Sequence, residues 1–107
     1  MKKTILLTIG LCSFMTLFSC VKLGPAASFR VHGNNDEMVV PYKATFLNLS
    51  TNADSYEWDF GDGTKSTAFC PVHTYTVAGK YTITLTAKGE NSSSTNSAIL
   101  HLFNETN

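Results

Sequence analysis

From Phe29 onward, valine, threonine, tyrosine and phenylalanine alternate with polar residues in short runs that glycine, asparagine and aspartate interrupt. No stretch of eleven residues there places apolar side chains at helical spacing, and alternation with a period of two is typical of β-strands. The pattern predicts strands over residues 28–32, 39–48, 55–60, 64–69, 72–75, 80–88 and 93–103, with Pro41 at an edge or a bulge. Seven strands in about 75 residues predict an all-β sandwich.

The alternation also predicts which side chains face the core, because successive residues of a strand point to opposite faces. The predicted inward set is Tyr56, Trp58 and Phe60 in the third strand and Tyr81, Ile83, Leu85 and Ala87 in the sixth, met by Ala44 and Phe46 from the facing sheet. In the last strand, Ala98, Leu100 and Leu102 compete with Ile99 and Phe103 for the inward direction. The inward face of that strand therefore stays open.

The first twenty residues have the layout of a secretory signal, with Lys2 and Lys3 ahead of an uncharged run. The run is shorter than the roughly 20 apolar residues that a membrane-spanning helix needs. It ends in Leu17-Phe18-Ser19-Cys20, which resembles the bacterial lipobox, where the cysteine is acylated and the preceding peptide is removed. We expect a lipoprotein signal peptide over 1–19, a lipid on Cys20 and a tether over 20–28; cleavage after Ser19 by an ordinary signal peptidase is the alternative.

The chain has 107 residues, with eight Lys and Arg against eight Asp and Glu. This length excludes a two-domain enzyme, and the balanced charge offers no basic face for DNA or RNA. Without residues 1–19, the chain carries a net charge of −2. With the sulfur of Cys20 acylated, Cys70 is the only free thiol, so no disulfide is expected within the domain.

Three separated motifs carry a family resemblance. They are Trp58-Asp59-Phe60-Gly61-Asp62-Gly63-Thr64, then His73-Thr74-Tyr75, then Ala78-Gly79-Lys80-Tyr81-Thr82-Ile83-Thr84-Leu85. In this order and spacing they closely resemble the PKD (polycystic kidney disease) domain, over residues 29–103, which leaves 104–107 as a C-terminal tail. The resemblance implies an immunoglobulin-like β-sandwich of cell-surface and secreted proteins, which serves as an interaction or spacing module and is not a catalyst.

Most residues of these motifs have structural explanations. Asp62-Gly63 after an alternating strand predicts a type I′ hairpin turn. The carboxylates of Asp59 and Asp62 are expected to accept hydrogen bonds from turn amides, with His73 and Tyr75 tying the neighbouring strand to the same turn. Gly79 suits a corner into the sixth strand, and the Tyr81 hydroxyl is expected to bond back to the backbone, as in a tyrosine corner.

Two chemical alternatives use the same residues. Two carboxylates and a histidine are groups that serve in acid-base catalysis, and Cys70 near His73 suggests a Cys-His pair, but no further nucleophile or oxyanion motif accompanies them. Calcium takes six to eight oxygen ligands, for which the candidates are Asn48, Ser50, Asp59 and Asp62. Calcium-binding PKD domains carry an acidic loop ahead of the tryptophan motif, whereas residues 50–55 offer one carboxylate here. We expect no resident cofactor, and zinc is disfavoured because paired His and Cys ligands are missing.

Two hypotheses for function remain. The first is a non-catalytic, lipid-anchored protein of the cell envelope that binds a polysaccharide or an envelope protein, with Tyr42 and Phe69 as candidate ligand contacts because flat rings stack on sugars and anchor protein contacts. The second is a structural spacer or accessory subunit of a larger envelope complex, with no ligand of its own. Both place the protein at the bacterial membrane through the lipid on Cys20, and neither involves nucleic acid.

Overall fold

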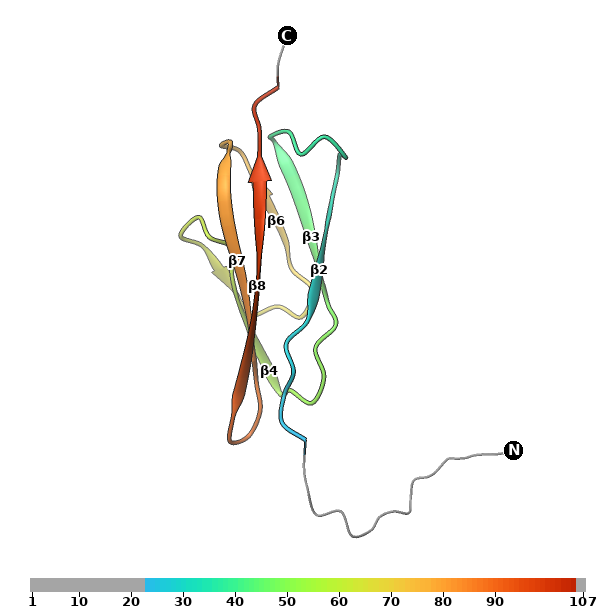
Figure 1. Ribbon diagram of the computed structural model, residues 1–107, viewed down its shortest axis with the longest axis vertical. Coiled ribbons are helices and arrows are strands. Elements are labelled where there is room, and N and C mark those ends of the chain that lie inside the picture. The colour runs from blue at the N-terminus through green and yellow to red at the C-terminus, as the bar shows by residue number, and fades with distance from the viewer. Residues whose placement is uncertain (1–22, 106–107) are drawn as a thin grey trace, which may run out of the picture.

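The computed structural model describes residues 23–105 (Figure 1). Seven strands follow one another in this part of the chain: β2 (Phe29–Gly33), β3 (Tyr42–Asn48), β4 (Ser55–Asp59), β5 (Lys65–Ser66), β6 (Val72–Tyr75), β7 (Gly79–Lys88) and β8 (Ser93–Leu102). The all-β prediction is therefore confirmed, together with the number of strands. The predicted signal peptide (1–19) and the predicted lipid site, Cys20, lie outside the described residues.

The strands form two sheets. One sheet has the order β2-β3-β6 and the other has the order β5-β4-β7-β8, with every pair of neighbours antiparallel. Two isolated bridges add to them: Ala26 pairs with Thr51, and Val39 pairs in parallel with Phe103. The predicted tether is thus docked on the domain from Ala26 onward.

The core lies between the sheets and is built around Trp58, which is fully buried. The Phe29 ring meets the indole edge-on, with ring centroids 5.2 Å apart. The centroid of the Phe46 ring, which belongs to the facing sheet, lies 5.4 Å from that of Trp58. The indole N–H donates a 2.9 Å hydrogen bond to the carbonyl of Ala68, so its one polar group is satisfied. The predicted inward residues Ala44, Ile83, Leu85 and Ala87 are also buried.

In β8 the structure decides the question that the sequence leaves open. Leu100 and Leu102 are buried, whereas Ile99 is 65% exposed and Phe103 is 50% exposed. Leucines at even positions therefore cover the core, and the odd positions face solvent.

Two predicted strands are shorter than expected by more than one residue. The run over 39–48 becomes a strand only at Tyr42, after Pro41, whose nitrogen has no hydrogen to donate to a ladder. The run over 64–69 is a strand only at Lys65–Ser66. There the Ser66 hydroxyl accepts a hydrogen bond from the amide of Ala68, which turns the chain away from β4.

The two ends of the described chain lie at opposite ends of the sandwich (Figure 1). The N-terminal segment emerges beside the β7-β8 hairpin, where Leu23 and Gly89 line the same small cavity. The chain ends at the other end, past β8. Within residues 23–105 no helix is long and apolar enough to cross a membrane.

Candidate functional site: the turn cluster

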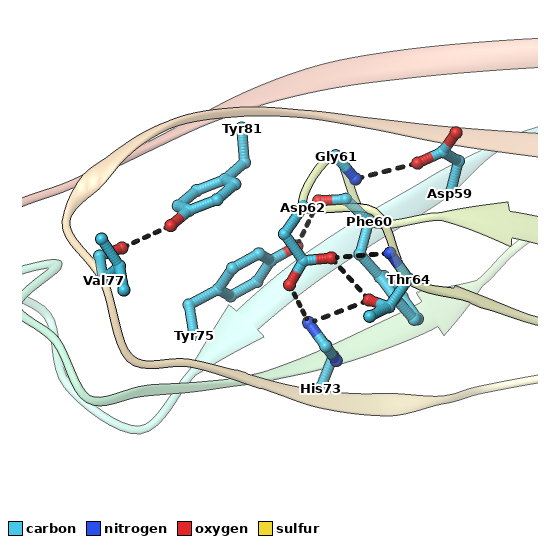
Figure 2. A network of polar contacts seen from close by, with 9 residues as sticks. All are labelled: Asp59, Phe60, Gly61, Asp62, Thr64, His73, Tyr75, Val77 and Tyr81. Carbon is cyan, nitrogen blue, oxygen red and sulfur yellow. Dashed lines mark hydrogen bonds and ion pairs between the residues drawn. The ribbon is translucent and has the colours of Figure 1, made fainter.

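The acids of the tryptophan motif, and the side chains that bond to them or to the backbone of the same turn, form one polar group (Figure 2). We call it the turn cluster: Asp59, Asp62, Thr64, His73 and Tyr75. The loop between β4 and β5 begins after Phe60, whose amide bonds the Thr64 carbonyl at 3.1 Å. Asp59 accepts the Gly61 amide at 3.0 Å, and Asp62 accepts the Thr64 amide at 3.1 Å. These are the turn-amide bonds that the sequence predicts.

The type I′ turn prediction is wrong. In this loop the residues with positive φ are Gly61 (83°) and Gly63 (94°), and Asp62 between them does not adopt a positive φ. The hydrogen bond between Phe60 and Thr64 closes a loop of three residues rather than two, so Asp62 can direct its carboxylate back to Thr64. Position 61 also requires glycine for steric reasons, because a Cβ atom there would clash with the carbonyl oxygen of Thr82 at 2.6 Å.

The cluster joins the two sheets. His73 lies on β6, in the three-stranded sheet, and its Nε2 is 2.6 Å from the Asp62 carboxylate and 3.3 Å from the Thr64 hydroxyl. The imidazole stacks on Phe60 with ring centroids 4.4 Å apart. Tyr75, two residues further along β6, donates its hydroxyl to the Phe60 carbonyl at 2.8 Å. The predicted tie from β6 to the turn is therefore present.

The electrostatics hold the Asp62 carboxylate in its charged form. Its partial burial opposes ionisation, but the hydrogen bonds from Thr64 and His73 outweigh this effect and lower the pKa of Asp62. For Tyr75, burial and then the nearby Asp62 charge raise the pKa of the hydroxyl, which remains a donor. A general acid needs the opposite, a carboxyl group whose pKa is raised.

The tyrosine corner is also present. The Tyr81 hydroxyl bonds to the carbonyl of Val77, and the Tyr81 ring lies 4.5 Å from that of Tyr75 (Figure 2). Gly79, between them in the chain, is the first residue of β7.

The four calcium candidates are not brought together. Asn48 is buried at the far end of β3, where its side chain donates to the Phe69 carbonyl and accepts the Ser50 amide. Asn48 lies four residues along β3 from Ala44, the partner of His73, so their Cα atoms are about 13 Å apart and Asn48 is directed away from the turn cluster. Among residues 23–105, no three His, Cys, Asp or Glu side chains are grouped as a metal site.

The two candidate ligand contacts have different outcomes. The prediction for Tyr42 is wrong, because its ring is only 4% exposed: it points inward with Ala44 and Phe46 and covers Gly33. Phe69 is 55% exposed and meets Tyr56 edge-on at 5.2 Å. Phe69 therefore remains a candidate contact.

The Cys-His pair does not form. Cys70 is exposed, and its sulfur accepts a hydrogen bond from the Asn48 amide, while the His73 ring is occupied by Asp62 and Thr64. Thr64 is the cluster residue that sequence reasoning does not single out. The signal for it is an aspartate two residues before a threonine, the spacing of an Asx turn.

Comparisons with known proteins agree with the fold described above. Residues 25–103 match the family model described as the PKD domain. Over 43 residues the chain is 49% identical to the pre-pro-metalloprotease PrtV of Vibrio cholerae, a match of 36% of this chain and 5% of the relative. Over 34 residues it is 56% identical to collagenase ColA of Bacillus cereus, which is 32% of this chain and 4% of the relative. The chain thus spans about a twentieth of the curated relatives it matches.

Among solved structures, the PKD1 domain of Vibrio anguillarum Epp aligns with 78% of this chain and 98% of its own, at 27% identity and a TM-score of 0.64. The PKD1 domain of PrtV from Vibrio cholerae aligns with 75% of this chain and 98% of its own, at 29% identity and a TM-score of 0.62. Both crystallised chains consist almost entirely of the aligned domain. Each of these two domains therefore folds without the rest of its own protein.

Proposed function

The chain belongs to the PKD family, and from this premise we propose that it is a non-catalytic, lipid-anchored protein of the bacterial cell envelope whose domain mediates contacts with a protein or a carbohydrate. The observation that carries the proposal is the state of the turn cluster. Its acids and its histidine bond to backbone groups and to one another. Neither the cavity beside Leu23 and Gly89, of about 150 Å³, nor the cavity beside Val39 and Phe103, of about 530 Å³, is lined by them. The polar residues of the motif support the fold and leave no group poised for catalysis.

The anchor in this proposal is Cys20, three residues ahead of Leu23. A buried methylene of an acyl chain contributes about 0.8 kcal/mol to membrane binding, so two or three chains hold a protein stably. Because the chain enters the sandwich beside the β7-β8 hairpin (Figure 1), a lipid on Cys20 would direct that end towards the membrane. The loop between β2 and β3 and the β6-β7 turn would then face away from it.

The contact residue in this proposal is Phe69. Its ring is supported by Tyr56, and its backbone carbonyl is held by the Asn48 side chain. An exposed ring on a rigid support is suited to stacking on a sugar or to anchoring a protein contact, because little side-chain entropy is lost on binding.

The spacer function is the second candidate, and the path of the chain favours it. The described ends lie at opposite ends of the sandwich, and the turn cluster ties the two sheets together (Figures 1 and 2). A domain of this form holds whatever follows it at a set distance from the anchor.

The experiment has two parts. Intact mass spectrometry of the membrane-extracted protein is expected to show two or three acyl chains, which a Cys20→Ala variant lacks; an unmodified native chain would refute the anchor. Affinity capture from the native envelope then compares Phe69→Ser with Val77→Ser, which removes an equally apolar surface residue that is 66% exposed. Loss of a partner in Phe69→Ser alone supports the binding module. A partner retained by both variants supports the accessory subunit.

A further inference from the structure

The four edge strands of the two sheets are not equally protected. Three of them are short: β5 has two residues, β6 has four and follows Pro71, and β2 has five and includes Arg30. The fourth, β8, has ten residues (Figure 1). It contains no Lys, Arg, Asp, Glu or Pro, and its pairing with β7 runs without a bulge from Gly79↔Leu102 to Lys88↔Ser93. Short length, charge, proline and bulges are four of the usual protections of an edge, and β8 has none of these four.

The hairpin determines which backbone groups of β8 point away from β7. The Gly89 amide bonds the Ser92 carbonyl at 2.7 Å, so this pair is hydrogen-bonded, and hydrogen-bonded pairs alternate along an antiparallel ladder. Even-numbered residues of β8 therefore bond to β7. The odd-numbered residues direct their N–H and C=O groups outward: Ser93, Thr95, Ser97, Ile99 and His101.

The next odd residue tests this assignment. Phe103 donates its amide to the Met38 carbonyl and accepts the Val40 amide, both at 2.9 Å, on the side away from β7. The edge of β8 thus already accepts one backbone partner at its C-terminal end. Ala27 also approaches β8, but through the side chains of Ser94 and Asn96. Within residues 23–105, no backbone group bonds to the outward groups from Ser93 to His101.

The geometry points to a second copy of this chain as the partner of β8, paired antiparallel about a two-fold axis at Ser97. The outward residues are symmetric about that position: Ser97 faces its own copy, Thr95 faces Ile99, and Ser93 faces His101. Each of these pairs is a hydrogen-bonded pair, so every outward N–H meets a C=O. Like charges directly opposite destabilise strand pairing, and a strand without charged residues has none to oppose. The two four-stranded sheets become one continuous sheet.

The pairing has a geometric consequence. Antiparallel β8 strands place the two Leu23 ends at opposite ends of the pair, because each chain enters its domain beside its own β7-β8 hairpin (Figure 1). Two copies held upright in one membrane do not meet this geometry, whereas copies on facing surfaces do. The inference rests on β8 alone and not on the anchor, so failure of one leaves the other standing.

The first test uses sedimentation equilibrium of residues 21–107 with Cys70→Ser, which removes the exposed thiol. Ser97→Pro deletes an outward N–H in each copy while the bonds to β7 remain, since proline is tolerated at an edge position whose N–H faces solvent. We expect the dimer dissociation constant to rise by about tenfold or more, from the loss of two hydrogen bonds. Ser97→Ala, which keeps the N–H, is the control and should remain dimeric.

The second test is cross-linking with a short bis-maleimide in the same Cys70→Ser background. Ser97→Cys places two thiols on the axis, on residues whose Cα atoms are about 5.5 Å apart in a hydrogen-bonded pair. Thr82→Cys is the control. Thr82 lies on β7 and pairs with Ile99 of β8, so the Thr82 residues of the two chains in the dimer would lie about 20 Å apart. Efficient cross-linking at position 97 alone is expected. A domain that is monomeric at high micromolar concentration, a dimer unaffected by Ser97→Pro, or equal cross-linking at both positions would overturn the inference.

Discussion

Replacement of Tyr75 by phenylalanine removes one oxygen atom from the centre of the turn cluster and leaves the ring in place. The ring contacts with His73, at 4.7 Å, and with Tyr81, at 4.5 Å, do not involve that atom. The variant loses the 2.8 Å hydrogen bond to the Phe60 carbonyl, which links β6 to the loop after β4. Tyr75 is 1% exposed and Phe60 is 3% exposed, so water does not replace the donor.

The expected loss in the free energy of unfolding follows from this burial. A typical hydrogen bond contributes about 0.5–1.5 kcal/mol net, and a buried carbonyl left without a partner costs about 1–3 kcal/mol. We expect Tyr75→Phe to destabilise the domain by about 1–3 kcal/mol. For a domain of this size, each kcal/mol lowers Tm by about 4–8 °C.

Urea denaturation followed by Trp58 fluorescence, with thermal unfolding as a second probe, measures the loss. Tyr56→Phe is the matched control, because no hydrogen bond of the Tyr56 hydroxyl occurs in the described structure, and its effect should stay within about 0.5 kcal/mol. Equal stability of the two variants would show that the hydrogen bond to the Phe60 carbonyl does not hold β6 to the turn, and the account of the cluster would be refuted.

Three further predictions concern the same region. Gly61→Ala should destabilise the domain more than Gly63→Ala, as comparative urea denaturation will show. Each alanine costs about 1–2 kcal/mol in the left-handed conformation, but only a Cβ atom at position 61 contacts Thr82. The native protein should be more stable than Asp62→Asn, with the whole difference present above about pH 4, the ordinary pKa of aspartate. The difference should shrink as the pH falls through the lowered pKa of Asp62, as unfolding curves from pH 2 to 7 will measure. Calcium and EDTA should leave Tm unchanged in calorimetry, because the four candidate oxygen donors do not converge; a calcium-dependent rise would contradict this.

The sequence predicts the parts of this fold that depend on local backbone geometry. Alternation with a period of two marks the strands and their faces, since it is a property of an extended chain whatever its neighbours are. Trp58, Ile83 and Leu85 are buried as predicted for that reason. The bonds of Asp59 and Asp62 to amides two residues away are local as well, and they were predicted correctly.

The wrong turn type at Asp62-Gly63 is a local error. The other errors concern residues far apart along the chain. The alternation that places Ala44 and Phe46 inward also places Tyr42 inward, so a contact role for Tyr42 conflicts with the direction its own strand predicts. The pairing of β2 with β3 then brings Gly33 beneath its ring. Asn48 and Ser50 are close to the residues of the turn cluster in sequence. They nevertheless lie at the other end of β3 from His73, so their oxygen atoms do not reach the cluster.

The sequence by itself thus determined an all-β domain of seven strands, its core faces and the local bonds of the turn. Only the tertiary structure decided that the leucines of β8 face inward and that the outward backbone groups from Ser93 to His101 have no partner within the described chain. The physical reason is that a strand's own residues set the direction of its side chains, whereas its position in a sheet depends on what pairs with each side of it. An exposed edge is therefore a property of the strand order and not of the strand.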